Sequence, residues 1–164
     1  MYSTKYVKAT NVNKAASIIA DAEDGKFLAG GMTLIPTLKQ RLASPDFVID
    51  LSDCKLTDIE DEGASIRIGA MSRHVDVAES VLVQNAIPAI ANLASQIGDR
   101  QVRNRGTIGG SLANNDPAAC YPSALLGLSA AIRFQTSPQY PPSRIPPCFL
   151  GIPHGGGSNG GRQR

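Results

Sequence analysis

The sequence predicts an alternating α/β fold, organised as one domain or as two small subdomains that share a core. Three observations support this prediction. Short apolar runs alternate with segments of helical periodicity over residues 1–132 of the 164-residue chain. Glycine, proline or a helix-capping residue separates most of these segments. Apolar residues make up 42% of the chain and charged residues 18%, as in ordinary globular domains.

The order of the elements follows from these patterns. Strands are predicted at four short apolar segments, residues 6–9, 26–28, 47–51 and 65–70. Helices are predicted after Asn11 or Asn13 as far as Ala22, from Leu34 to Leu42 behind Thr33, from Ser72 through Val81, from Pro88 to Ile97, and from Pro122 through Leu128. Residues 101–115 are mostly polar and contain three glycines. We therefore treat this stretch as a loop.

The composition changes after Ile132. Residues 133–164 contain six prolines and six glycines but no aspartate, glutamate or lysine. Such a segment buries too little apolar surface to offset the entropy lost on ordering, and paired prolines do not suit central strands. We therefore expect a folded domain over residues 1–132 and a disordered Pro/Gly/Arg-rich tail over residues 133–164.

The first of two glycine-rich segments is Ala29-Gly30-Gly31-Met32-Thr33, which we call the first loop. Glycine after a strand lets the backbone turn with positive φ and approach a ligand closely. The N–H groups that open the following helix favour an anion such as a pyrophosphate. The same residues also suit a tight strand-to-helix turn without a ligand. The spacing differs from the GxGxxG pattern of dinucleotide-binding Rossmann units.

The second segment includes Thr107-Ile108-Gly109-Gly110-Ser111, which we call the second loop. Backbone amides around its double glycine can form an anion-binding concavity. Residues 114–116 can cap a following helix or accept hydrogen bonds from a ribose. The arginines at 100, 103 and 105 either steer an anion or are solvated surface. Two double-glycine loops in one short chain suggest a split diphosphate site.

Several other classes of site are not supported. Cys54, Cys120 and Cys148 form no CxxC pair, and His74 and His154 do not complete a set of zinc or iron–sulfur ligands. No apolar run approaches the roughly 20 residues of a membrane helix, and the start has no signal-peptide pattern. We therefore expect a cytoplasmic protein without a metal site and without membrane insertion.

The charge distribution gives little support to nucleic-acid binding. Residues 1–132 carry 14 acidic and 12 basic side chains, a net charge of −2, whereas residues 133–164 carry four arginines and no acid. Four scattered arginines without interleaved aromatic residues are a weak signal for a nucleic-acid or anionic membrane surface. We predict no nucleic-acid partner.

Both loops resemble those of the FAD-binding subunit of molybdenum hydroxylases, the family of carbon monoxide and xanthine dehydrogenases. Residues 29–36 are similar to the family's AGGxxLxP loop, and residues 103–111 with 115–118 are similar to its RNxGTIGG…DPA loop. Ile68-Gly69-Ala70 and Ser72-Arg73-His74 between them also resemble the family. The resemblance covers residues 1–132.

This resemblance implies an α+β (mixed α/β) fold of two subdomains, with FAD in the cleft between them. The FAD-binding residues that it implies are Ala29, Gly30, Gly31, Met32, Thr33, Ile97, Thr107, Ile108, Gly109, Gly110, Ser111, Asp116 and Cys120. The flavin supplies the redox chemistry, so no catalytic acid, base or nucleophile is expected. We predict a structural role for His74.

The resemblance also implies the role of the chain and its partners. The family passes electrons from [2Fe–2S] clusters on a small subunit through FAD to an external acceptor, after a molybdopterin-containing large subunit oxidises the substrate. We therefore expect an FAD-dependent oxidoreductase subunit. The alternative is a truncated, non-catalytic remnant or a subunit-docking module that holds no flavin.

Two departures from the family bear on this expectation. Many relatives have an acidic residue at the position of Cys120, where it can bind the flavin nucleotide. A cysteine cannot bind as a carboxylate would, so we expect a lower affinity for FAD. The alternative without a ligand is a small buried residue at the start of a helix. Relatives also continue past Ile132 with further strands and a separate C-terminal domain. The change of composition after Ile132 suggests a truncated or frameshifted version of the family fold.

Overall fold

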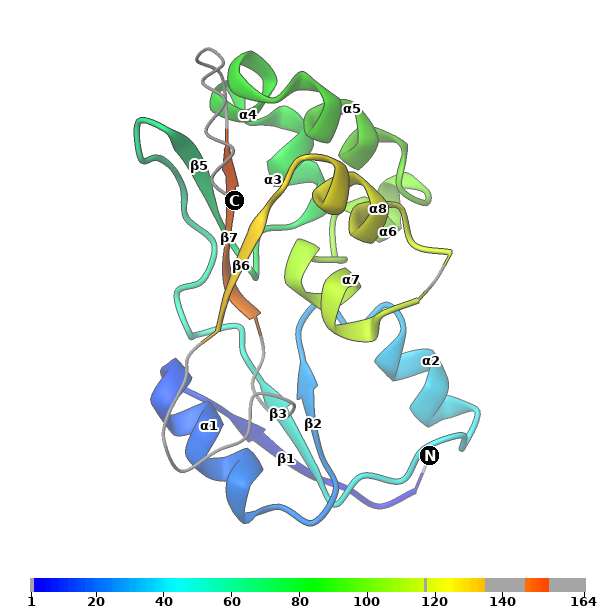
Figure 1. The fold of residues 1–164 in the computed structure, drawn as a ribbon. Helices are drawn as coiled ribbons and strands as arrows, with labels where there is room; N and C mark the ends of the chain where they lie inside the picture. The colour runs from blue at the N-terminus through cyan, green and yellow to red at the C-terminus, as the bar shows by residue number, and fades with distance from the viewer. Residues whose placement is uncertain (1, 117, 135–146, 154–164) are drawn as a thin grey trace, which may run out of the picture.

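The computed structural model describes residues 2–116, 118–134 and 147–153 (Figure 1). The prediction of a disordered tail therefore lies partly outside the described residues. In chain order, the elements are β1 (Lys5–Lys8), α1 (Val12–Asp21), β2 (Gly25–Leu28), α2 (Leu34–Lys39), β3 (Phe47–Asp50), β4 (Ile59–Asp61), β5 (Ser65–Gly69), α3 (His74–Glu79), α4 (Val81–Ala86), α5 (Pro88–Gln96), α6 (Arg100–Arg103), α7 (Ile108–Asn114), α8 (Cys120–Gly127), β6 (Ala131–Phe134) and β7 (Pro147–Pro153).

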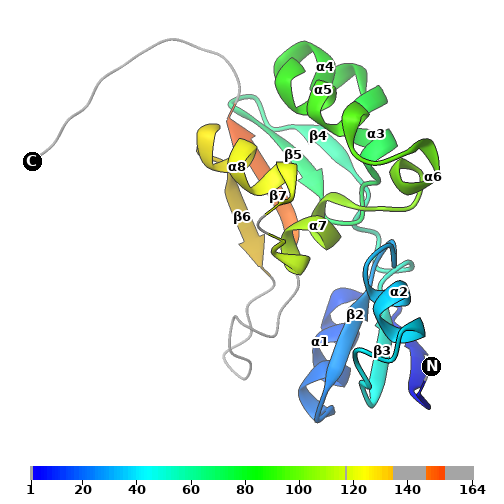
Figure 2. The same cartoon turned by 90° about the vertical axis from the view of Figure 1, so that its right-hand side faces the viewer.

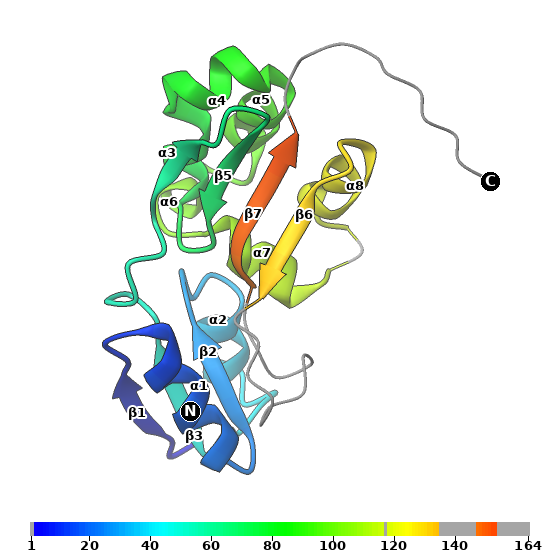
Figure 3. The same cartoon turned by 60° about the vertical axis from the view of Figure 1, so that its left-hand side comes forward.

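The N-terminal part is a three-stranded parallel sheet in the order β1-β3-β2. Helix α1 begins at Asn11, whose side chain accepts a hydrogen bond from the Lys14 N–H at 2.8 Å. Apolar residues of α1, including Ala15 and Ile19, cover Ile49 of the central strand. Helices α1 and α2 lie on opposite faces of this sheet (Figures 1 and 3). Right-handed crossovers that run in opposite directions along a sheet produce this arrangement.

The second part is a four-stranded antiparallel sheet in the order β4-β5-β7-β6. Helices α3, α4, α5, α7 and α8 gather on one side of it (Figures 2 and 3). The larger hydrophobic core lies between this sheet and the helices, and its fully buried members include Ile66, Ile68, Val77, Ile90 and Ile152. The two sheets with their helices confirm the predicted mixed α/β class.

The predicted disorder after residue 132 is wrong for the segments that form β6 and β7. Strand β7 pairs with β5 on one side and β6 on the other, so it is a central strand. Its prolines, Pro147 and Pro153, are its first and last residues, so both lie outside the interior of the hydrogen-bonded ladder. Composition alone did not indicate that Ile152 would be fully buried in the core.

Three helix predictions also need correction. Helix α2 ends at Lys39 rather than Leu42. The predicted cap Ser72 is one residue too early, because Arg73 occupies the N-cap of α3 and Ser72 is buried with its hydroxyl donating to the Thr57 carbonyl at 3.1 Å. The stretch treated as a loop contains α6 and α7, with Gly109 and Gly110 inside the first turn of α7.

None of the described helices has the length and apolar character needed to cross a membrane. Likewise, within the described residues no group of three or more His, Cys, Asp or Glu side chains is placed to hold a metal ion.

Candidate cofactor-binding site

The two glycine loops, far apart in the sequence, meet where the two sheets adjoin. Figures 1 and 2 show the connection between β2 and α2 reaching toward the segment between α6 and α7. The two main chains pack so closely that a Cβ atom added to Gly30 would lie 2.0 Å from the Arg105 carbonyl oxygen and 2.9 Å from Gly106 Cα. A Cβ atom on Gly110 would lie 3.6 Å from Ala29 Cβ. The structure therefore brings the two predicted loops together.

The first loop lies at the carboxyl end of the edge strand β2. Gly31 has φ +75°, in the left-handed region where glycine is favoured. Met32 and Thr33 are exposed. Thr33 occupies the N-cap position of α2, but its side chain makes no capping hydrogen bond. Among the described residues, the N–H groups of residues 30–33 make no hydrogen bond.

The second loop, in contrast, has most of its N–H groups bonded within the protein. The Ile108 N–H donates to the Ser72 carbonyl at 3.0 Å, and the Gly109 N–H donates to the Ala70 carbonyl at 2.9 Å. The hydroxyl of Thr107, the N-cap of α7, accepts from the Gly110 N–H at 3.1 Å. The Thr107 carbonyl accepts from the Ser111 N–H at 3.0 Å. The predicted anion-binding amides of this loop are therefore already used by the fold.

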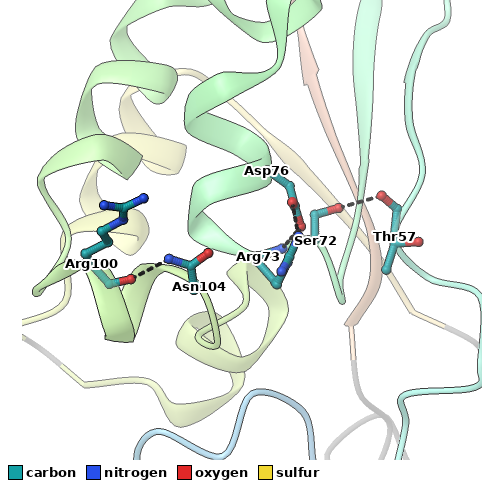
Figure 4. A network of polar contacts seen from close by, with 6 residues as sticks. All are labelled: Thr57, Ser72, Arg73, Asp76, Arg100 and Asn104. Atoms are coloured by element: carbon teal, nitrogen blue, oxygen red, sulfur yellow. Dashed lines mark hydrogen bonds and ion pairs between the residues drawn. The ribbon is translucent and has the colours of Figure 1, made fainter.

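Arg73 and Asp76 bond to each other at the start of α3 (Figure 4). The Asp76 carboxylate accepts hydrogen bonds from the Arg73 backbone N–H at 3.0 Å and from its guanidinium at 2.7 Å and 2.8 Å, which fixes the first turn of α3. The next N–H, that of His74, donates to the Gly106 carbonyl at 3.0 Å. The main chain before Thr107 is therefore held against α3.

His74 is buried and its ring lies 5.5 Å from that of Tyr121, centroid to centroid. Burial lowers the pKa of His74 to about 4, so the imidazole is neutral at physiological pH. Burial also raises the pKa of Tyr121. Neither His74 Nδ1 nor the Tyr121 hydroxyl has a partner within the described residues. A buried neutral ring in contact with Gly106 fits the structural role that we predict for His74.

Arg103 has a structural role that the sequence did not reveal. Its guanidinium donates to the Gly98 carbonyl at 2.9 Å and to the Ile97 carbonyl at 3.4 Å, where α5 ends. Asp99 accepts from the Val102 N–H at 2.8 Å and starts α6. The predicted site residue Ile97 is half-buried and packs against the larger core. The signal that was missed is an arginine shortly after a helix end, where its guanidinium can bond to free carbonyls five and six residues before it.

Two predicted site residues lie on the connection from α7 to α8 rather than in the loops. Asp116 is exposed and its carboxylate accepts from the Ala118 N–H at 2.8 Å. Cys120 begins α8 with an exposed free thiol, so the alternative of a small buried residue is wrong. Within the described part of the chain, neither side chain bonds to the first or second loop. Pro117 between them is not described.

Comparison with known proteins identifies the fold and its family. Residues 2–142 match the family model described as the FAD binding domain in molybdopterin dehydrogenase. The chain superposes on carbon monoxide dehydrogenase from Hydrogenophaga pseudoflava, in a form that lacks the Mo-pyranopterin moiety of the molybdenum cofactor, with a TM-score of 0.87. That match has 29% sequence identity and covers 93% of this chain and 60% of the other.

Curated relatives agree with the structural match. The nicotine 6-hydroxylase medium subunit of Paenarthrobacter nicotinovorans is 37% identical over 133 residues, which are 80% of this chain and 47% of that protein. The carbon monoxide dehydrogenase medium chain of Hydrogenophaga pseudoflava is 38% identical over 128 residues, 77% of this chain and 45% of that protein. The chain thus spans about half the length of the curated relatives it matches. It belongs to the family of FAD-binding domains of molybdopterin dehydrogenases.

Proposed function

We propose that the chain holds FAD at the junction of its two glycine loops and serves as the electron-transfer component of a molybdenum hydroxylase. Electrons would pass from iron–sulfur clusters through FAD to an external acceptor. The expected partners are a molybdopterin-containing large subunit and a [2Fe–2S] small subunit. Relatives named as medium subunits and medium chains support this assignment.

The observation that carries the proposal is the meeting of the two loops. The N–H groups of residues 30–33 make no hydrogen bond among the described residues, and the first loop lies against the second. Backbone N–H groups that the fold leaves unpaired are the donors that a diphosphate needs. The residues present therefore fit the diphosphate of FAD.

The second loop contributes in another way. Four of its N–H groups are bonded within the protein, so what it can offer a ligand is the small residue Gly110 and the half-buried Ser111 with its hydroxyl group. The exposed residue Thr33 contributes a hydroxyl group from the first loop. When bound, the flavin supplies the redox chemistry, and the chain's residues bind and orient it. No acid, base or nucleophile from this chain is required.

The first test is the visible absorption spectrum of the purified chain, with the released flavin identified after denaturation. Stoichiometric FAD, taken up during expression or on incubation, is the expected result. No flavin bound at excess FAD would reject the proposal and favour the alternative, a remnant or docking module that holds no flavin. Stoichiometric FMN in place of FAD would reject the diphosphate assignment.

Hydroxyl variants test the same site without a steric clash. Thr33→Val and Ser111→Ala each remove a hydroxyl and add no bulk to a packed contact. Losing a hydrogen bond to a charged group costs about 1.5 kcal/mol, so each variant is expected to raise the Kd for FAD about tenfold. The matched control is Ser44→Ala, an exposed serine before β3 at the opposite end of the parallel sheet. Equal Kd values for Thr33→Val, Ser111→Ala and Ser44→Ala would show that neither hydroxyl contacts FAD.

A further inference from the structure

Gly30 and Gly31 are neighbours, but the structure requires glycine at each for a different reason. Gly31 has φ +75°, whereas Gly30 does not have a positive φ. A Cβ atom on Gly30 would lie 2.0 Å from the Arg105 carbonyl oxygen, 2.7 Å from its carbonyl carbon and 2.9 Å from Gly106 Cα. All three atoms belong to the main chain, so no side-chain rotation relieves the clash. Position 30 is therefore constrained by contact with another segment of the protein.

The segment that receives Gly30 is held firmly by its own neighbours. The Arg105 and Gly106 N–H groups both donate to the Val102 carbonyl, at 3.1 Å and 2.7 Å. The Gly106 carbonyl accepts from the His74 N–H, and the buried His74 ring lies against Gly106, where an added Cβ would meet Nε2 at 2.6 Å. Moving this segment away from Gly30 would break these bonds. The position of this segment is therefore set by bonds that do not involve Gly30.

The contact also joins the two halves of the fold. Gly30 follows β2 of the parallel sheet, and residues 105 and 106 precede α7, which packs with the antiparallel sheet (Figures 1 and 3). Every atom in this contact belongs to the chain itself, so the contact does not require a cofactor. A closely packed main-chain contact of this kind fixes where the first loop stands relative to the second.

We propose that Gly30 is a positioning residue that docks the first loop onto Arg105 and Gly106 before any cofactor binds. Position 30 is then glycine because any side chain there would prevent the first loop from packing against residues 105 and 106. The two loops are already in contact in the apoprotein. The inference deepens the proposed function, since it says how the site for FAD is organised in advance. Preorganisation lowers the cost of ordering the first loop on binding.

The main test compares Gly30→Ala with Gly127→Ala, a glycine whose added Cβ would meet no atom within 4 Å. Without FAD, Gly30→Ala is expected to lower the melting temperature by about 5 °C or more, and Gly127→Ala is not. Gly30→Ala is also expected to raise the Kd for FAD at least about tenfold. At saturating FAD, the ³¹P resonances of its diphosphate should shift in Gly30→Ala alone, because the first loop is displaced.

A measurement on the unmodified chain keeps the proposal open to rejection even if Gly30→Ala does not fold. In the apoprotein, an NOE is expected between the Hα protons of Gly30 and those of Gly106. An NOE that appears only after FAD is added would overturn the proposal, as would an apoprotein melting temperature unchanged by Gly30→Ala. Neither measurement depends on FAD, so failure of the unmodified chain to bind FAD would reject the proposed function and leave this inference standing.

Discussion

The first and second loops have the same sequence pattern, a double glycine after a short apolar segment, yet they use their main chains differently. In the second loop, four successive N–H groups, from Ile108 to Ser111, donate to protein acceptors. In the first loop, the N–H groups of residues 30–33 have no acceptor within the described residues. The second loop thus uses its N–H groups within the fold, whereas those of the first loop make no hydrogen bond among the described residues. A shared motif does not imply a shared role.

The largest loss of stability is expected from Gly109→Val, which tests whether the second loop is packed into the fold. A Cβ at this position would lie 2.6 Å from both the Ala70 carbonyl oxygen and the Ala70 Cβ. Valine would therefore push α7 away from the end of β5 and break the Gly109 to Ala70 hydrogen bond. We expect a loss of about 3 kcal/mol or more in unfolding free energy, measured by urea denaturation of the apoprotein.

Gly127→Ala is the control for this substitution, since no atom lies within 4 Å of the added Cβ. If Gly109→Val unfolded at the same urea concentration as the control but lost FAD, the glycine would serve ligand access instead. Because Gly109 and Gly30 both touch protein main chain or Cβ atoms, loss of FAD in bulky variants at these positions does not by itself locate the ligand.

A second prediction concerns the pH dependence of stability that arises from His74, which packs against Gly106 before the second loop. Burial lowers the pKa of His74 to about 4, below its value of about 6.5 in an unfolded chain. Between these two values the unfolded chain binds a proton that folded His74 does not, so stability falls as pH decreases from 6.5 toward 4. The loss from this residue is at most on the order of 3 kcal/mol. The pKa values of Asp46, Asp50 and Asp76 are also lowered. Their contribution to stability is lost mainly below pH 4, outside the range in which His74 contributes.

The measurement is the urea midpoint of the apoprotein at intervals from pH 7 to pH 4. His74→Leu removes the titrating group from its buried position and should flatten the curve in this window. A His74→Leu variant with the same pH slope as the unmodified chain would show that another group is responsible.

These differences explain which parts of the structure the sequence could predict. Local signals worked where the partners are close in sequence, as with Asn11 at the start of α1 and Pro88 at the start of α5. The motif itself located both loops. The sequence did not show that Ser72 and Ala70 would accept hydrogen bonds from the second loop, because these partners come from a distant segment. Helix α7 was missed because a double glycine normally disfavours a helix, and Thr107 offsets this by capping its first turn.

Strand β7 shows the limit of composition as a guide. Proline and glycine content predicted disorder for the whole of residues 133–164, yet Pro147–Pro153 pairs with two neighbouring strands. The decisive facts are positional, because both prolines lie at the ends of the strand. Residues 135–146 and 154–164 lie outside the described part of the chain, and there the prediction stands as a prediction.

A smaller effect is expected when the end of α5 loses its cap. Arg103→Ala removes the guanidinium that donates to the carbonyls of Ile97 and Gly98. We expect a loss of about 1–2 kcal/mol in unfolding free energy, because the freed carbonyls lose a charged donor. Arg100→Ala is the control, since this exposed side chain lies on the same short helix and should change stability by less than about 0.5 kcal/mol. Similar losses in both variants would mean that α6 responds to any change of charge.

The smallest effect compares the two threonines that precede α2 and α7. Thr107 caps α7 through its hydroxyl, whereas Thr33 occupies the same position before α2 without a side-chain capping bond. Thr107→Val should therefore lower the unfolding free energy of the apoprotein by about 1 kcal/mol, and Thr33→Val should change it by less than about 0.5 kcal/mol. Both substitutions keep the β-branched shape, so the difference isolates the hydroxyl. Equal losses in the two variants would mean that the first loop is also closed on itself in solution, and its N–H groups would then be poor candidates for binding a diphosphate.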